Sequence, residues 1–309
     1  MADERRQGAA PTSSAADERR QGAAPTSSAA WRLRIHHVTG FAYPGTAYAS
    51  YNEARMTPMT TPWQITLFSQ VEVAPAAAAS TWRYLDYWGS QVTVFDLQRA
   101  HQQLKVTASS MVETERPAAP PHAGWDVLRS KSTVDRYAEL LTLTPRTTVD
   151  EALRAQAAEL ADGLLPCDAA RAIGDWVRDN VAYVPGSTGV QTGAQEAWEL
   201  RKGVCQDIAH LTAALLRAVG IPVRYVSGYL HPKPDAEIGE TVAGQSHAWV
   251  EWWCGGWEGY DPTNGVPTGE RHVVVARGRE YQDVTPLKGV YHGAPSSTLG
   301  VTVEVTRLG

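Results

Sequence analysis

The sequence lacks several features that would assign it to a common class of protein. It contains no apolar run close to the roughly 18 residues that a membrane-spanning helix needs. It contains no block of basic residues, and its net charge of −5 arises from both signs mixed along the chain. Its N-terminus has no apolar core behind basic residues, as a secretory signal would have. We therefore expect no membrane partner, no nucleic-acid partner and no export signal.

Cysteine is scarce. The three cysteines, at positions 167, 205 and 254, are odd in number and lack metal-ligand spacing. Without an export signal, we expect a cytoplasmic location in which these thiols are reduced and free, and in which Cys254 has no partner. No acidic loop has the spacing of a calcium-binding hand, and the glycine-rich segment 186–193 has no phosphate-binding pattern. No metal and no cofactor are therefore expected.

The composition is that of a folded protein, except at the N-terminus. The chain has 309 residues, of which 43% are apolar and 20% charged, which is enough for two domains with a sizeable core. Residues 2–15 read ADERRQGAAPTSSA, and residues 16–29 repeat this string letter for letter. The repeat has no aromatic residue and cannot bury enough surface to offset the entropy lost on ordering. We predict that residues 1–30 are disordered.

Strand-like alternation begins at Trp31 and recurs at short intervals, which predicts an antiparallel β domain over residues 31–115. A linker rich in proline and alanine follows over residues 116–131. Residues 132–309 then change mainly to helical periodicity and form the second predicted domain. The strands expected in the first domain lie around residues 31–35, 41–43, 63–73, 81–86, 91–97 and 104–112.

The second predicted domain combines helices with a few strands. Thr148 and Glu151 have the spacing of a capping box at the start of a helix. A later helix is apolar at every third or fourth position, and Gly220 ends it. The helices are expected over residues 132–141, 151–160, 169–180 and 205–219, the strands over 223–230, 247–253, 257–260, 273–276 and 301–306, and an exposed loop over 231–244.

One stretch carries most of the chemical information. Cys205 stands at the start of the 205–219 helix, where backbone N–H groups and the helix dipole favour a thiolate over a thiol. His247 opens a predicted strand and could take the proton of Cys205, then remain as an imidazolium partner. Asp261 ends the returning strand and could hold the imidazole through its other nitrogen. The hairpin spacing places Asp261 diagonal to His247, or next to a bulge.

A second interpretation stays open at this point. Free cysteines are usually unreactive core residues, and residue type and spacing alone do not separate a nucleophile from a buried thiol. The alternative from another functional class is a non-catalytic interaction module, in which the β domain binds a partner and the second domain is a scaffold.

Several segments closely resemble the bacterial transglutaminase-like superfamily. Residues 34–39 (RIHHVT), residues 52–55 (NEAR) and Pro58 resemble the N-terminal β region of that family. The resemblance covers about residues 31–309. The four segments that carry it in the second domain are residues 203–211 (GVCQDIAHL), 220–229 (GIPVRYVSGY), 247–251 (HAWVE) and 261–264 (DPTN).

The resemblance implies both a fold and residue roles. The implied fold is α+β, with a papain-like transglutaminase core in which a helix bearing Cys205 packs on an antiparallel sheet bearing His247 and Asp261. An antiparallel β domain precedes this core. Cys205 would be the nucleophile, His247 the general base and acid, and Asp261 the orienting carboxylate. The implied reaction is acyl transfer through a thioester, with a carboxamide or peptide bond as donor and an amine or water as acceptor.

The other residues near Cys205 have weaker claims. The backbone N–H of Cys205 is expected to contribute to an oxyanion hole. Gln206, Tyr183 and Trp198 are weak candidates for a second donor, and Asp207 for a hydrogen bond to nearby backbone; for each of the four a structural role is the stronger expectation. His210 is expected to face away from the site.

The resemblance leaves the substrate and the acceptor open. The family also includes peptidases and amide hydrolases, so a cysteine peptidase or amidohydrolase of the same fold is the nearest alternative. The partner expected is a protein, a peptide or a small amide substrate. The oligomeric state is left open.

Overall fold

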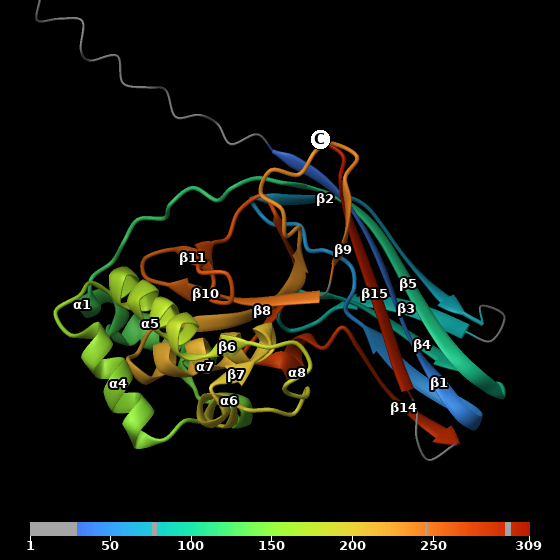
Figure 1. The fold of residues 1–309 in the computed structure, drawn as a ribbon, viewed down its shortest axis with the longest axis horizontal. Helices are drawn as coiled ribbons and strands as arrows, with labels where there is room; N and C mark the ends of the chain where they lie inside the picture. The colour runs from blue at the N-terminus through green and yellow to red at the C-terminus, as the bar shows by residue number, and fades with distance from the viewer. Residues whose placement is uncertain (1–29, 76–78, 245, 294–297) are drawn as a thin grey trace, which may run out of the picture.

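The computed structural model describes residues 30–75, 79–244, 246–293 and 298–309. The predicted disorder of the repeat at residues 2–29 lies outside the described residues. The described chain forms a curved β unit on one side and a mixed unit of helices and a smaller sheet on the other (Figure 1). Within the described ranges, no helix is long and apolar enough to span a membrane.

The β unit is organised around one long strand, β1 (Trp31–Ala54). The first half of β1 pairs with β5 and β15, and its second half pairs with β4 and β14. Side chains of β1 alternate between buried and exposed from Trp31 to Ile35, as the sequence pattern predicts. The other strands of the unit are β2 (Gln64–Ala74), β3 (Ala79–Leu85), β4 (Gln91–Leu97), β5 (His101–Thr114), β9 (Thr241–Gly244), β14 (Leu287–Gly293) and β15 (Thr298–Arg307).

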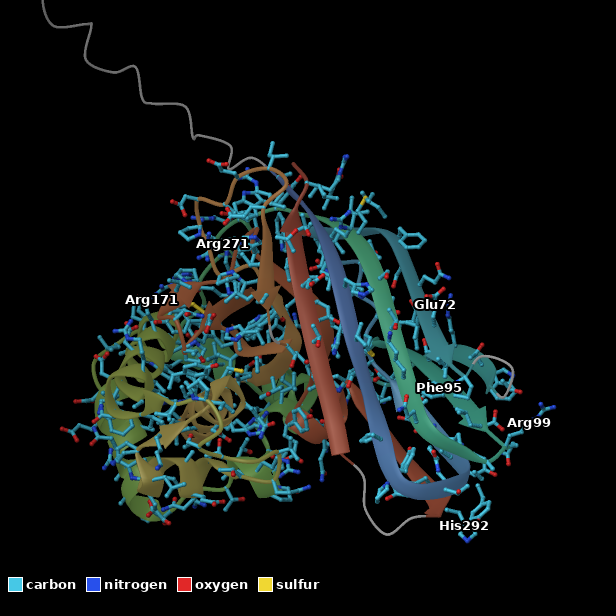
Figure 2. All side chains as sticks on the ribbon, turned by 45° about the vertical axis from the view of Figure 1, so that its right-hand side comes forward. Glu72, Phe95, Arg99, Arg171, Arg271 and His292 are labelled. Atoms are coloured by element: carbon cyan, nitrogen blue, oxygen red, sulfur yellow. A yellow bond between two sulfur atoms is a disulfide. The ribbon has the colours of Figure 1, made fainter. Side chains whose placement is uncertain are left out.

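Side chains of β1 contribute to two separate hydrophobic cores. Leu33 and Ile35 belong to a core shared with the helical unit, whereas Ala47 and Ala54 belong to a core enclosed within the β unit. Figure 2 shows Phe95, fully buried in the second core, well away from Arg171 on the helical side. Both units therefore bury apolar surface against β1, which joins them physically.

The C-terminal strands belong to the first sheet. β15 pairs with β1 and β14 pairs with β1, so residues 287–293 and 298–307 lie in the β unit although they follow the helical unit in sequence. The sequence placed them with the second domain over residues 132–309. The expected loop 231–244 differs too, because it contains β9, which pairs with β15 at the sheet edge.

The helical unit follows the expected order with two local differences. The predicted helix over 132–141 is broken at Tyr137 into two short helices. Asp150 caps the next helix by accepting a hydrogen bond from the Leu153 N–H at 2.9 Å, so the predicted capping box at Thr148 is wrong. The bounds are α1 (Trp125–Leu128), α2 (Lys131–Arg136), α3 (Ala138–Leu141), the 3₁₀ turn η2 (Pro145–Thr147), α4 (Glu151–Ala161), α5 (Pro166–Asn180), α6 (Ala194–Leu200), α7 (Cys205–Ala218) and α8 (Tyr281–Val284).

The smaller sheet has the strand order β12-β11-β10-β8-β13, and α7 packs against β10 and β8. Gly228 on β8 has no room for a side chain, because a Cβ there would lie 1.9 Å from the Val273 carbonyl oxygen and 2.6 Å from the Trp249 ring. The bounds are β8 (Val223–Leu230), β10 (Ser246–Trp253), β11 (Trp257–Asp261), β12 (Val266–Pro267) and β13 (His272–Gly278), with the short pair β6 (Ala182–Tyr183) and β7 (Lys202–Gly203) alongside.

The β unit braces the outer strand β13 of this smaller sheet. The buried Gln64 side chain donates from Nε2 to the Val274 carbonyl at 2.8 Å and accepts from the Val274 N–H at 2.8 Å. Gln64 thus satisfies both backbone groups of Val274 at the sheet edge, and the Met59 N–H also donates to the Val274 carbonyl at 3.0 Å. The Thr114 hydroxyl donates to the Glu270 carbonyl at 2.5 Å, just before β13 begins. The start of β13 is therefore held from outside its own unit.

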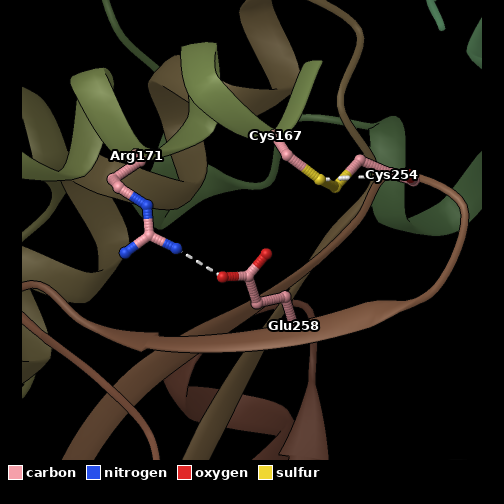
Figure 3. The surroundings of a disulfide bond; sticks show 4 residues. All are labelled: Cys167, Arg171, Cys254 and Glu258. Carbon is pink, nitrogen blue, oxygen red and sulfur yellow. Dashed lines mark hydrogen bonds and ion pairs between the residues drawn. A yellow bond between two sulfur atoms is a disulfide. The ribbon is translucent and has the colours of Figure 1, made fainter. Parts of the chain in front are cut away.

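Cys167 and Cys254 form a disulfide, with their Cα atoms 5.7 Å apart (Figure 3). The expectation that all three thiols are free, and that Cys254 lacks a partner, is therefore wrong. The bond joins α5 to the turn between β10 and β11, and its Cα separation is typical of disulfides. Cys205 is the free cysteine among the described residues. The cytoplasmic location, from which free thiols were expected to follow, stays a prediction.

Candidate active site

Cys205 is the first residue of α7, where backbone N–H groups lack partners within the helix. The preceding turn is held by Asp207, whose Oδ2 accepts from the Val204 N–H at 2.8 Å and from the Thr188 hydroxyl. Burial raises the pKa of Asp207, although these two hydrogen bonds act in the opposite direction. Gly203 packs so closely that a Cβ there would lie 2.8 Å from the Asp207 side chain. Asp207 therefore fixes the turn that presents Cys205.

His247 and Asp261 lie on neighbouring strands of the smaller sheet. Their hairpin pairs Val250 with Tyr260, so Asp261 lies opposite Trp249 and diagonal to His247, as the sequence spacing predicts. The His247 Nε2 atom lies 2.7 Å from Asp261 Oδ2. Because Nε2 is occupied, Nδ1 is the ring nitrogen available to Cys205, whose side chain lies close enough to His247 to raise the pKa of the imidazole.

The Asp261 carboxylate is fully buried and surrounded by N–H donors. Oδ1 accepts from the backbone N–H groups of Thr263 at 3.0 Å and Asn264 at 3.2 Å. Oδ2 accepts from the Asn264 side-chain amide at 2.6 Å and faces His247 and His272. Burial alone would raise the pKa of Asp261, but the hydrogen bonds from the two histidines outweigh it and hold the pKa well below its usual range. Asp261 therefore carries its charge without bulk water.

The negative charge of Asp261 raises the pKa of His247. Burial lowers the pKa of His247, but the hydrogen bond to Asp261, the charge of that carboxylate and the interaction with the Cys205 side chain raise it to about 10. The imidazolium form is therefore stabilised between two acidic groups at neutral pH. A cysteine paired with an imidazolium is the arrangement that activates a thiol as a nucleophile.

His272, the first residue of β13, is a second histidine next to the same carboxylate, and the sequence pattern did not predict it. Its Nε2 lies 3.3 Å from Asp261 Oδ2, and its Nδ1 accepts from the Gly269 N–H at 3.3 Å. The proton of the neutral ring therefore sits on Nε2 and points at Asp261. Burial lowers the pKa of His272 more than Asp261 raises it, so the ring stays neutral. In the sequence, the feature that could have indicated a role for His272 is its position as a polar residue at the start of an apolar strand.

The other candidates divide into neighbours of Cys205 and structural residues. Tyr183 lies next to Gly203 in the β6–β7 pair, is half-exposed, and interacts electrostatically with Cys205. Gln206 is buried beside Asp207. Trp198 stacks on Trp176 with ring centroids 4.8 Å apart, and the Arg201 guanidinium covers its ring at 3.2 Å. Tyr183 is therefore the candidate side chain best placed to reach a bound substrate.

His210 has a structural role, as expected. It is fully buried, and its Nε2 accepts from the Tyr281 N–H at 3.0 Å, which anchors the start of α8. Its ring lies 4.8 Å from that of Tyr225. Burial and two nearby arginines lower the pKa of His210 to about 3, so it remains neutral.

The His272 contact predicts a graded effect of substitution. We expect His272→Phe to lower the turnover number about 10–100-fold with little change in KM, because Asp261 loses a donor and shifts relative to His247. His272→Gln keeps an N–H donor and should retain most of the activity. Steady-state kinetics of the two variants check this. Equal losses in both, or a loss confined to KM, would contradict a positioning role.

The His247–Asp261 pair also predicts a pH-dependent part of the stability. The folded pKa of His247 lies above its usual value of about 6.5, so its contribution is complete below about pH 6.5 and is lost as the pH rises toward about 10. The depressed pKa of Asp261 contributes above about pH 4 and is lost only in stronger acid. In Asp261→Asn, the fall in unfolding free energy between about pH 6 and pH 10 should shrink by about 1–3 kcal/mol. Urea unfolding across this range measures it, and an unchanged pH profile would contradict it.

Comparison with known proteins covers both units. The model of the transglutaminase-like superfamily matches residues 152–262, and that of the bacterial transglutaminase-like N-terminal region matches residues 33–113. An uncharacterized protein of Mycobacterium leprae is 47% identical over 279 residues, which cover 90% of this chain and 99% of that protein. The protein-glutamine gamma-glutamyltransferase of Pseudomonas aeruginosa is 34% identical over 121 residues, 36% of this chain and 18% of that enzyme.

A solved structure shares the fold. The crystal structure of a protein from Cytophaga hutchinsonii, named "Putative Cysteine Protease", superimposes with a TM-score of 0.72 at 24% identity, covering 91% of this chain and 92% of that one. The α+β class and the papain-like core, which the sequence resemblance implied, are therefore confirmed. With both units matched and a relative similar over nearly its whole length, the chain belongs to the transglutaminase-like superfamily.

Proposed function

We propose that the protein is a cysteine-dependent acyltransferase or amide hydrolase that works through a thioester on Cys205. The observation that supports this most is the connected set formed by Cys205 at a helix N-terminus, His247 beside it and Asp261 bonded to His247 at 2.7 Å. A charged imidazole held by a buried carboxylate next to a thiol is the arrangement that acyl transfer requires.

The proposed reaction has two halves. The Cys205 thiolate attacks the carbonyl carbon of a carboxamide or peptide bond, and His247 gives its proton to the departing ammonia or amine. A thioester remains on the sulfur. His247, now neutral, takes a proton from an incoming amine or water, which attacks the thioester and releases the thiolate. The backbone N–H of Cys205, at the first position of α7, would stabilise the oxyanion in both halves.

The proposed activity takes one of two forms, depending on the acyl acceptor: a transferase if an amine accepts the acyl group, and a hydrolase if water does. The relative from Pseudomonas aeruginosa is named as a protein-glutamine gamma-glutamyltransferase, which favours an amine as acceptor. The structural neighbour carries the name of a cysteine protease, which favours water and a peptide bond. We place the transferase first, because its sequence is the more similar of the two over the segment that it matches.

The test uses two substrates with one control. The intact protein is incubated with a glutamine-containing peptide and a labelled primary amine, and with an unfolded protein substrate. Ammonia release with amine incorporation supports the transferase, ammonia release alone supports the hydrolase, and new amino termini support the peptidase. All three should vanish in Cys205→Ala. Activity that survives in Cys205→Ala would overturn the proposed role of Cys205. No acyl adduct on Cys205 with any of the substrates would overturn the proposal and favour an interaction module.

A further inference from the structure

A second group of reactive side chains lies away from Cys205, where four segments meet. Cys167 is the second residue of α5, Cys254 lies in the turn between β10 and β11, and Glu258 lies on β11. His122 comes from the segment that joins the β unit to α1. A ring nitrogen of His122, the sulfur of Cys167 and a carboxylate oxygen of Glu258 lie within 4.8 Å of one another. Figure 3 shows Glu258 beside the two cysteines, with Arg171 bonded to its carboxylate.

These donors form a familiar set for a metal ion. Two thiolates, one imidazole and one carboxylate suit tetrahedral Zn²⁺, which binds them at about 2.0–2.3 Å. Ligand atoms around such an ion lie roughly 3.3–3.8 Å apart, so the three within 4.8 Å need only side-chain rotation to reach that spacing. The fourth donor is Cys254, whose sulfur is bonded to that of Cys167 in the disulfide and therefore lies in the same cluster.

The surroundings hold the segments together. The Ala123 N–H donates to the Cys254 carbonyl at 2.6 Å, which fixes the residue after His122 against the turn. Gly255 allows this approach, because a Cβ there would lie 2.4 Å from the Pro121 carbonyl oxygen. Both cysteines are buried, whereas His122 is exposed. An ion would therefore enter past His122 and be shielded on the cysteine side.

We propose that this cluster is a redox-gated site for a thiophilic divalent cation such as Zn²⁺. In the disulfide form, the sulfur atoms are bonded to each other and offer no thiolate. A dithiol reductant transfers two electrons and two protons, which gives two cysteine thiols and an oxidised dithiol. The ion then displaces both thiol protons and is bound by Cys167, Cys254, His122 and Glu258. In either form α5 stays tied to the hairpin that carries His247 and Asp261.

The test measures cobalt binding in a Cys205→Ala background, because Cys205, His247 and Asp261 could themselves bind the ion. The protein is reduced, freed of reductant under nitrogen and titrated with Co²⁺, whose visible spectrum reports tetrahedral thiolate ligands. We expect about one equivalent to bind in the reduced protein, to be displaced by Zn²⁺, and not to bind in the oxidised protein. Reduction should leave the fold intact by circular dichroism.

Co²⁺ binding in two variants of proposed ligands distinguishes binding at this site from non-specific binding by a single thiol. His122→Ala should weaken Co²⁺ binding about tenfold or more, and Cys167→Ser, which leaves only the Cys254 thiolate, should weaken the thiolate bands by about half. His36→Ala, which removes another exposed histidine, should change nothing. Binding that is equally tight in the oxidised protein, or that is unaffected by His122→Ala, would overturn the proposal. Since His122 is exposed, its replacement should not prevent folding, and the comparison stays valid.

Discussion

Replacing His247 with alanine is expected to lower the rate of thioester formation on Cys205 by about 10³–10⁴-fold. The imidazole has two tasks that no neighbour can take over: it holds the positive charge beside the thiolate and it protonates the leaving amine. Asp261 and His272 remain in the variant, but neither reaches the sulfur in the arrangement described. The loss should appear in single-turnover formation of the acyl-enzyme, followed by intact-protein mass spectrometry.

The control for this variant is another histidine, His37 on β1 of the β unit. His37 is buried and its Nδ1 lies 2.9 Å from the Tyr229 hydroxyl, so His37→Ala removes a buried imidazole without touching Cys205, His247 or Asp261. It should reduce stability more than activity. Added imidazole should restore part of the lost rate in His247→Ala, since the vacated space opens beside Cys205. A rate within tenfold of the unsubstituted protein would mean that His247 is not the base.

The second large effect concerns stability. Glu251 on β10 is buried between two arginines: Arg277 binds it in a bidentate pair with both N–O distances 2.9 Å, and Arg224 bonds to the same carboxylate. Burial alone would raise the pKa of Glu251, but the two arginines lower it to about 2. Glu251→Ala would leave two largely buried guanidinium groups without a counter-charge. We expect a loss of about 3–5 kcal/mol in the free energy of unfolding.

Urea unfolding at neutral pH measures this loss. Two further variants serve as controls for its size. Glu251→Gln keeps the shape and should lose less, because the amide oxygen still accepts hydrogen bonds. Asp135→Ala breaks the exposed Lys131–Asp135 pair and should change stability by no more than about 1 kcal/mol. Because the pKa of Glu251 is depressed, its contribution is present above about pH 4 and is lost as the pH falls through about 2. A loss below 1 kcal/mol in Glu251→Ala would contradict the account.

The sequence predicted local elements well where one pattern was strong. The helix that begins at Cys205 ends one residue from its expected end, and the strand Val223–Leu230 was predicted with both bounds correct. Each has a regular apolar pattern bounded by glycine or proline, so local chemistry suffices. The same pattern predicted the hairpin that carries His247 and Asp261, and with it their diagonal placement.

The pairings between distant parts of the chain were not predictable in this way. β15 pairs with β1 more than 250 residues away in sequence, and its own pattern does not say which sheet it joins. Cys167 and Cys254 are 87 residues apart, and only the packing of α5 on the hairpin turn brings them together. His272 reaches Asp261 because β13 lies at the sheet edge and is braced by Gln64. Each depends on tertiary contacts that a local pattern does not contain.

We infer that His247 and Asp261 keep Cys205 ready to react as a nucleophile at neutral pH. The most direct measurement is the rate of Cys205 alkylation by iodoacetamide, from about pH 5.5 to pH 9, in the non-reduced protein, with adducts mapped by mass spectrometry. The disulfide protects the other two cysteines, and a cysteine-containing peptide gives the reference rate. The account predicts that Cys205 reacts much faster than the peptide at pH 6 and that its rate is nearly level up to pH 8. A Cys205 rate that follows the peptide, rising about tenfold per pH unit toward about pH 8.5, would contradict it.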